Sequence, residues 1–247
     1  QVVVDVLASA FDSAGQRCSA LRVLCLQDEI ADHTLKMLRG AMAECRMGNP
    51  GRLTTDIGPV IDSEAKANIE RHIQTMRSKG RPVFQAVREN SEDAREWQSG
   101  TFVAPTLIEL DDFAELQKEV FGPVLHVVRY NRNQLPELIE QINASGYGLT
   151  LGVHTRIDET IAQVTGSAHV GNLYVNRNMV GAVVGVQPFG GEGLSGTGPK
   201  AGGPLYLYRL LANRPESALA VTLARQDAKY PVDAQLKAAL TQPLNAL

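Results

Sequence analysis

The feature that most constrains the fold is a regular alternation of short apolar runs with amphipathic helical stretches in the second half of the chain. Residues 124–130 form a strongly apolar run, and two further runs follow at 149–154 and 172–176. Helical patterns occupy the intervals at 134–144 and 158–168. Strands that alternate with helices of this length build βαβ units, in which a parallel sheet is covered on both faces. The sequence therefore predicts an α/β fold with a mostly parallel open sheet.

The first half of the chain continues this pattern. Capping residues and glycine stops place its helices, and short β-rich runs place its strands. Residues 88–100 are charged and rich in turn formers, which predicts a surface loop. Late in the chain, a Leu- and Tyr-rich run predicts one more strand. The helices are expected at 2–11, 28–45 and 62–79, and the additional strands at 21–26, 81–87, 106–109 and 205–211.

The composition sets broad limits on function. A chain of 247 residues with 44% hydrophobic content can bury a sizeable core, and a net charge of −3 gives no general affinity for nucleic acid. No apolar run reaches membrane-spanning length, and no signal peptide is visible. Three cysteines predict free thiols in a reducing compartment, and hence a cytoplasmic protein. The chain starts with Gln1 and ends without a terminal signature, so we expect a piece of a longer protein.

Cys18 is the candidate nucleophile. It follows Gly15, which permits a tight turn after the first helix, and it stands beside Arg17. A thiol becomes a good nucleophile when positive charge favours its thiolate, and either Arg17 or a helix that begins near Ser19 would supply that charge. The alternative is that Cys18 is a small buried apolar side chain, which is the role expected for Cys25.

A second stretch, Glu119-Val120-Phe121-Gly122-Pro123, forms a turn directly before the strand at 124–130. Such a turn can direct an acidic and an aromatic side chain into a cleft. A carboxylate there can bind two ribose hydroxyls, and a ring can pack against a flat cofactor. The alternative is a solvated Glu119 and a core Phe121 before a proline turn.

One other motif is excluded by its context. Residues 191–196 match G-x-G-x-x-G, but no β-rich run precedes them, and Pro199 and Pro204 prevent the long helix that should follow. A glycine-rich loop that closes over a pocket is the better interpretation. No cysteines or histidines have metal-ligand spacing, and none of the five histidines has a flanking motif that marks it as a catalytic base.

Taken together, these stretches resemble the aldehyde dehydrogenase superfamily. Gly15–Cys18 resembles its nucleophile motif, and Glu119–Pro123 resembles its E-x-F-G-P cofactor motif. Asn143–Leu149 resembles its N-x-x-x-Y-G-L segment, and Pro188–Gly191 with Ser195-Gly196 resembles its late P-F-G-G…S-G segment. Their order and spacing match over about residues 1–212. The resemblance implies the α/β catalytic domain of such an enzyme.

A narrower resemblance is to the branch that oxidises L-glutamate γ-semialdehyde, the pyrroline-5-carboxylate dehydrogenases. Ser19 directly after the cysteine fits this branch, and Val180–Phe189 resembles its aldehyde anchor loop. The run Pro199–Tyr206 resembles bifunctional proline-catabolic flavoproteins of bacteria, in which further sequence follows this domain. The implied division is a catalytic domain at 1–198, a strand of an oligomerisation flap at 199–212 and a helical connector at 213–247.

The resemblance also implies roles for individual residues. Cys18 would attack the aldehyde to give a thiohemiacetal, and hydride transfer to NAD would leave a thioester that water hydrolyses to glutamate. Glu119 would bind the nicotinamide-side ribose, with Phe121 near the nicotinamide. The backbone N–H of Cys18 would help to hold the developing oxyanion. The substrate would be bound through its α-carboxylate and its aliphatic part by Ser19, Gly181, Ala182 and Phe189.

The chain departs from the family by omission. Members of the family carry a nucleotide-binding domain, a general-base glutamate and an oxyanion-hole asparagine upstream of the cysteine, and none of these is in this sequence. We therefore expect that the chain on its own neither binds NAD well nor turns over.

The implied partners are a small aldehyde, the remainder of the longer chain and a second copy in a homo-oligomer such as a dimer. FAD is implied only for a proline dehydrogenase part of the longer protein. Any contact with nucleic acid or membrane would come through other parts of that protein.

Three alternatives stay open from the sequence. The first is an aldehyde dehydrogenase for a different semialdehyde, which the effect of Ser19→Ala on several aldehydes would distinguish. The second is a non-catalytic assembly piece, which would dimerise and have an unreactive Cys18. The third is a cysteine hydrolase, which would need a histidine coupled to the thiolate.

Overall fold

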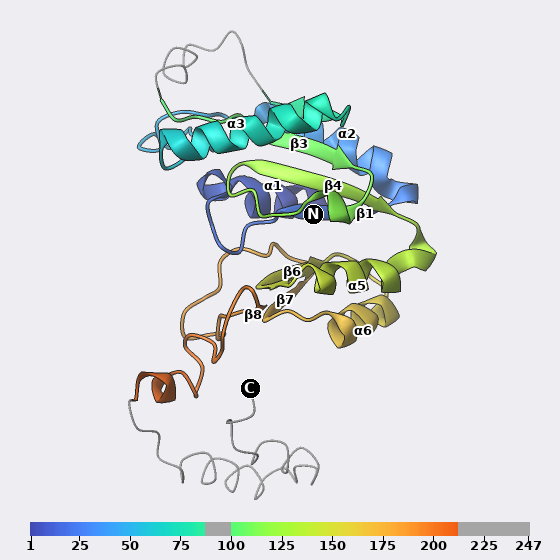
Figure 1. Cartoon of the computed structure of the whole chain (residues 1–247), viewed down its shortest axis with the longest axis vertical. Coiled ribbons are helices and arrows are strands. Elements are labelled where there is room, and N and C mark those ends of the chain that lie inside the picture. Colours follow the sequence, from blue (N-terminus) through green and yellow to red (C-terminus); the bar gives the residue numbers. More distant parts are fainter. Residues whose placement is uncertain (87–99, 212–247) are drawn as a thin grey trace, which may run out of the picture. The chain divides into compact units, whose positions relative to one another are not determined.

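The computed structural model describes residues 1–86 and 100–211, and the chain divides into one unit at Gln1–Gly203 and a second that begins at Pro204. The first unit contains a four-stranded sheet in the order β1-β4-β3-β2 (Figure 1). Strand β4 is parallel to both β1 and β3, whereas β2 is antiparallel to β3. The mostly parallel α/β fold predicted from the sequence is confirmed. The strands are β1 (Val23–Gln27), β2 (Val83–Gln85), β3 (Thr106–Leu110) and β4 (Val124–Tyr130).

Strand β4 is the centre of the core. Its first five residues, 124–128, are all buried, and the strand is paired on both edges. A strand that is covered on both faces needs a continuous apolar run, and this explains why the stretch was recognisable in the sequence. Residues within β4, such as Val124 and Val127, have no exposed surface and belong to one hydrophobic cluster with the flanking helices.

Three helices pack against this sheet: α1 (Val2–Phe11), α2 (Asp28–Glu44) and α3 (Ser63–Ser78). Helices α1 and α2 contact β4 and each other, and α3 contacts β2. The helix predicted at 62–79 is confirmed and is capped by Asp62, whose carboxylate accepts a hydrogen bond of 2.7 Å from the Ala65 N–H. Helix α1 does not bury every apolar residue that it contains. Val4 is 65% exposed, whereas the polar residue Ser9 is buried and its hydroxyl accepts a hydrogen bond from the Met179 N–H.

The second half of the unit forms two smaller sheets, and within residues 1–86 and 100–211 neither is hydrogen-bonded to the first. Strands β6 (Thr150–Val153) and β7 (Asn172–Val175) pair in parallel, and β5 (Tyr147–Gly148) pairs antiparallel with β8 (Glu192–Gly193). Helices α5 (Leu135–Ala144) and α6 (Asp158–Ser167) accompany them (Figure 1). The predicted parallel strands are thus present, but they lie in two separate sheets. Single-turn 3-10 helices occur as η1 (Asp12–Gly15), η2 (Phe113–Glu115) and η3 (Arg132–Gln134).

The strand predicted at 205–211 is wrong. In the second unit, residues 207–210 form a 3-10 turn, η4 (Leu207–Leu210), and their side chains, including Leu207 and Leu210, are largely exposed. A strand is held by hydrogen bonds to a neighbouring strand, and the described part of the chain offers none to this segment. The predictions for residues 87–99 and 213–247 lie outside the described residues. Within the described residues, no helix is both long enough and apolar enough to span a membrane.

Candidate active site

The loop that carries Cys18, residues 12–21, is called here the Cys18 loop. It leaves the buried end of α1 through the 3-10 turn η1, in which Ser13, Ala14 and Gly15 all have positive φ angles of 54° to 65°. The chain then makes a turn that contains Cys18 and Ser19. Cys18 is exposed with a free thiol, whereas Ser19 is buried at 7% exposure. The loop therefore presents the sulfur to solvent while Ser19 anchors it in the protein.

Of the two sources of positive charge predicted for this thiol, the helix is absent from the structure. No helix begins near Ser19, because the chain becomes extended and enters β1 at Val23. The Arg17 guanidinium donates its Nε–H to the Ser13 hydroxyl at 3.0 Å and so stays within the loop. The cation that interacts electrostatically with Cys18 is Arg22, which follows in the sequence just before β1.

The second predicted stretch, residues 119–123, is called here the Glu119 loop. It lies directly before β4, with Val120 buried and the side chains of Glu119 and Phe121 partly exposed at 35% and 46%. A Cβ on Gly122 would lie 2.3 Å from the end of the Ile69 side chain, so a larger residue there would have to displace that side chain. The alternative of a core Phe121 is thereby corrected, because its ring is available at the surface.

The two loops meet backbone to backbone. A Cβ on Gly15 would lie only 2.1 Å from the carbonyl oxygen of Gly122. In addition, the Arg22 Nε–H donates to Glu119 Oε1 at 3.0 Å. The structure thus brings the candidate nucleophile loop and the candidate cofactor loop together, although about a hundred residues separate them in the sequence.

The predicted substrate residues Gly181 and Ala182 lie in a loop without regular structure. Gly181 has a φ of +78°, and within the described part of the chain neither N–H of the pair has a hydrogen-bond acceptor. The beginning of this loop is fixed to α1, because the Met179 N–H donates to the Ser9 hydroxyl at 3.1 Å. Phe189 is half-buried and is held by a two-bond bridge to Ala201. The N–H groups of Gly181 and Ala182 are therefore available for an anion, as a carboxylate-binding loop requires.

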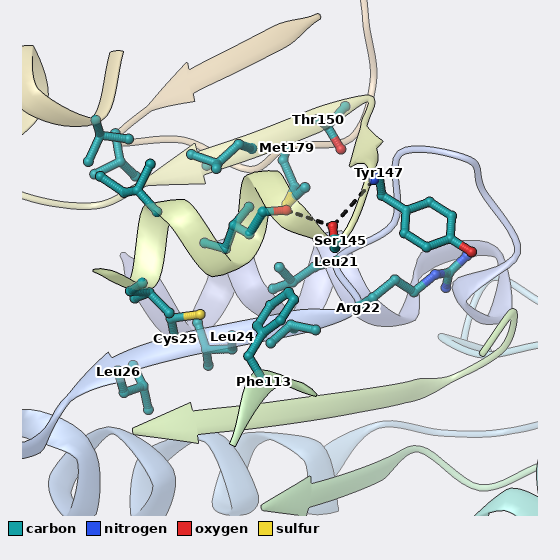
Figure 2. A pocket seen from close by; sticks show the side chains of 18 of the residues that line it. Leu21, Arg22, Leu24, Cys25, Leu26, Phe113, Ser145, Tyr147, Thr150 and Met179 are labelled. Atoms are coloured by element: carbon teal, nitrogen blue, oxygen red, sulfur yellow. Dashed lines mark hydrogen bonds between the residues drawn. The ribbon is translucent and has the colours of Figure 1, made fainter. Parts of the chain in front are cut away.

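A cavity of about 390 Å³ lies between β1 and β6, beside helix α5. Figure 2 shows β1 side chains such as Leu24 and Cys25 along it, with Arg22 and Tyr147 far from Cys25 in the view. Its lining is mainly apolar but includes Cys18 and Glu119; Ser19, Phe121, Gly181, Ala182 and Phe189 do not line it. Burial raises the pKa of the Cys25 thiol to about 12, so this cysteine stays protonated and structural, as predicted. The cavity adjoins the candidate site but does not enclose it.

No described histidine makes a hydrogen bond or an ion pair with Cys18. The rings of His72 and His126 bond each other through their Nε2 atoms at 2.9 Å, and His154 faces Asp5 at 3.7 Å. A histidine committed to such a partner is not positioned to take a proton from the thiol, which weighs against the hydrolase alternative. Among the described residues, no group of three or more His, Cys, Asp or Glu side chains could hold a metal ion.

An exposed cysteine on a loop with positive φ angles and a carboxylate loop beside it lie on a mostly parallel α/β core, as the resemblance to aldehyde dehydrogenases implies. The chain belongs to the aldehyde dehydrogenase family, which it matches over residues 1–212. It is 90% identical over all 247 residues to the bifunctional protein PutA of Salmonella typhimurium and 85% identical to that of Klebsiella aerogenes. In each case the chain spans about a fifth (19%) of the length of the relative.

Solved structures agree with this assignment. PutA from Bradyrhizobium japonicum superimposes with a TM-score of 0.77 at 51% identity, covering 83% of this chain and 20% of that one. A 1-pyrroline-5-carboxylate dehydrogenase from Thermus thermophilus gives a TM-score of 0.73 at 36% identity, covering 83% of this chain and 38% of that one. The similarity therefore extends to separate enzymes of the pyrroline-5-carboxylate branch.

Proposed function

We propose that this chain supplies the catalytic cysteine of an NAD-dependent aldehyde dehydrogenase that oxidises L-glutamate γ-semialdehyde to L-glutamate in proline catabolism. The observation that carries this proposal is that the Cys18 loop, whose thiol is exposed, meets the Glu119 loop through the backbones of Gly15 and Gly122. The resemblance to PutA and to 1-pyrroline-5-carboxylate dehydrogenases supports the choice of aldehyde. The three free thiols support a reducing compartment such as the cytoplasm.

The chemistry begins at Cys18. Its thiolate adds to the aldehyde carbonyl carbon and forms a thiohemiacetal, and the backbone N–H of Cys18 helps to hold the developing oxyanion. When bound, NAD supplies the acceptor for the hydride that leaves this carbon. The Cys18 thioester that remains is then cleaved by water, which gives the carboxylic acid and returns the thiol.

The residues of the Glu119 loop fit a nicotinamide nucleotide. Glu119 has an exposed carboxylate, and a carboxylate accepts hydrogen bonds from both hydroxyls of a ribose. Phe121 offers a half-exposed ring on the same loop for packing against a flat ring. These two side chains would hold the nicotinamide end of the cofactor, and the remaining contacts would come from outside this chain.

The α-carboxylate and ammonium of the substrate distinguish it from simple aldehydes. We assign the carboxylate to Ser19 and to the free N–H groups of Gly181 and Ala182, because donors in a loop with a positive φ form a suitable anion site. Phe189 would pack on the aliphatic carbons between the two ends of the substrate.

The nucleophile is tested by Cys18→Ser. The variant is made in a chimaera in which this chain replaces the matching segment of Salmonella typhimurium PutA. NADH formation with L-glutamate γ-semialdehyde should fall by at least about 10³-fold, because the alcohol is a far weaker nucleophile than the thiolate. Cys45→Ser is the matched control, since Cys45 lies at the end of α2, and it should keep near-normal activity. A Cys18→Ser rate within about tenfold of the parent would contradict the proposal.

The chain without the rest of the longer protein is predicted to be inactive. Cys18 faces solvent. Among the described histidines, His72 and His126 bond each other, and His154 faces Asp5. The base for thioester hydrolysis would then have to come from elsewhere. Clear NADH production by the 247-residue chain in the same assay would overturn this prediction.

Substrate choice is tested by Ser19→Ala in the same chimaera. Loss of a hydrogen bond to a charged group weakens transition-state binding by about 1.5–3 kcal/mol, or roughly 10- to 100-fold in kcat/KM. The loss should apply to L-glutamate γ-semialdehyde and not to an uncharged aldehyde such as butanal. Equal losses for both aldehydes would show that Ser19 only supports the loop.

A further inference from the structure

Arg22 occupies the junction between the Cys18 loop and the Glu119 loop, and no motif marks it. Its side chain is only 13% exposed, yet it carries a full positive charge. The guanidinium donates to the carbonyl oxygen of Gly15 at 2.5 Å through Nη1 and to that of Arg17 at 3.1 Å through Nη2. The Arg17 carbonyl belongs to the residue directly before Cys18. Arg22 therefore closes the loop on itself, with Cys18 next to one of the two attachment points.

The same guanidinium also binds the Glu119 loop. Its Nε–H donates to Glu119 Oε1 at 3.0 Å, and Nη1 lies 3.5 Å from the carbonyl oxygen of Gly122. Its central carbon stands 4.6 Å from the centroid of the Phe121 ring, which is a cation–π contact. A planar fork with five N–H donors can make bonds in three directions at once, and a lysine ammonium on a flexible stem cannot reproduce this arrangement.

The charges around Arg22 are consistent with a shared role. Burial lowers the pKa of Arg22, while the carboxylate of Glu119 and the negative charge of Cys18 act in the opposite direction. Arg17, the other arginine of this region, bonds only the Ser13 hydroxyl among the described side chains and makes no contact with the Glu119 loop. Arg22 is thus the cation that interacts with the nucleophile and with the carboxylate assigned to the cofactor.

We propose that Arg22 is a positioning residue that fixes the Cys18 thiolate relative to the Glu119 carboxylate and so aligns the bound aldehyde with the nicotinamide end of the cofactor. This inference rests on the proposed function for the roles of Cys18 and Glu119. It assigns to Arg22 no contact with substrate or with reacting atoms. Its effect passes through the backbone of the Cys18 loop and through the side chains of Glu119 and Phe121.

The test compares Arg22→Met, Arg22→Lys and the control Arg17→Met in the PutA chimaera. The first readout is the rate at which iodoacetamide alkylates Cys18 across pH 6–9, followed by mass spectrometry of the Cys18 peptide. The second is the dissociation constant of NAD, and the third is kcat and KM for the aldehyde. Alkylation needs no turnover, so this readout tests Arg22 even if the chimaera oxidises no aldehyde.

For Arg22→Met we expect slower alkylation of Cys18, because the thiolate loses its nearby cation. NAD should bind at least about fivefold more weakly, and kcat should fall about 10- to 100-fold with little change in KM for the aldehyde. Arg22→Lys restores the charge but not the fork. It should recover most of the alkylation profile while kcat stays low.

Two results would overturn the inference. One is an Arg22→Met protein that matches the parent in its alkylation profile, NAD affinity and kcat. The other is an Arg22→Lys protein that is folded by circular dichroism and has the parent's kcat, since a point charge would then suffice. If Arg22→Met does not fold, Arg22→Lys carries the test, because the two readouts are expected to separate in that variant.

Discussion

His126 shows how much of the site's surroundings depends on single residues. It lies in β4 with none of its surface exposed, and its Nδ1 is 3.1 Å from the carbonyl oxygen of Arg22. This carbonyl can only accept, so Nδ1 carries the proton and Nε2 accepts from the Nε2–H of His72 at 2.9 Å. Burial, followed by the charge of His72, lowers the pKa of His126 to about 4. A second proton on His126 would place two N–H groups face to face.

This residue predicts a pH dependence of stability. The pKa of His126 is lower in the folded chain than in the unfolded chain, so the unfolded state binds more protons between about pH 6.5 and pH 4. The stabilisation is complete above about pH 6.5 and is lost as the pH falls towards 4. His126 should contribute up to about 3 kcal/mol of this loss. Urea titrations at several pH values give the free energy of unfolding at each pH. This free energy should change less steeply with pH in His126→Asn than in the parent chain.

The exposed His169 provides the control, since His169→Asn should leave the slope unchanged. If His126→Asn keeps the parent's dependence of the free energy of unfolding on pH, then carboxylates, and not the histidine pair, govern acid sensitivity.

Cys18 and Glu119 could be recognised from sequence because they stand in motifs with fixed spacing. Arg22, His72 and His126 could not, because their partners are supplied by segments that meet only in the folded chain.

At the scale of elements, the turn η1 is the part of the Cys18 loop whose conformation depends most on the identity of its residues. Its last residue, Gly15, combines a φ of +65° with a close approach to the carbonyl oxygen of Gly122. Gly15→Ala should therefore destabilise the chain by at least about 2 kcal/mol, because both the backbone conformation and the space are incompatible with a methyl group.

Gly40 is the matched comparison. It lies on the exposed side of α2, and a Cβ there would meet no atom within 4 Å. Gly40→Ala should stabilise the chain by about 0.5–1 kcal/mol, since alanine loses less backbone entropy in a helix. Thermal unfolding of both variants checks the pair. A Gly15→Ala protein as stable as the parent would show that the two loops are not in backbone contact.

The elements themselves were predictable to different degrees. Strand β4 and helix α3 were recognisable because each is specified locally, one by a continuous apolar run and the other by Asp62 as its cap and Gly80 after its end. The segment at 205–211 was not, because a Leu- and Tyr-rich run has the composition of a strand whether or not a neighbouring strand is present.

At the scale of the whole first unit, the two parallel sheets differ in how their strands are held. Strands β3 and β4 are paired on both edges, whereas within the described residues β1 is bonded only to β4 and β6 only to β7. The cavity lies between the free edges of β1 and β6. Amide hydrogen exchange of the chain should therefore be slowest in β3 and β4 and at least about tenfold faster in β6.

Exchange that is as slow in β6 as in β4 would contradict this arrangement and would indicate that the two sheets pair across the cavity. The comparison is internally controlled, because the exchange rates of the β4 amides and the β6 amides are measured in one sample. Exchange in α1, which packs on the core through Ala10 and Phe11, should resemble that of β4.

The sequence specified the class of fold and the identity of the reactive groups. Alternating apolar runs with capped helices leave few arrangements other than a parallel α/β sheet, and motifs with fixed spacing pick out Cys18 and Glu119. Folding added the relation between them. Gly15 and Gly122 touch, and Arg22 joins their loops, because β1 and β4 pair side by side. Such contacts depend on which distant segments pair, and local composition carries no record of that choice.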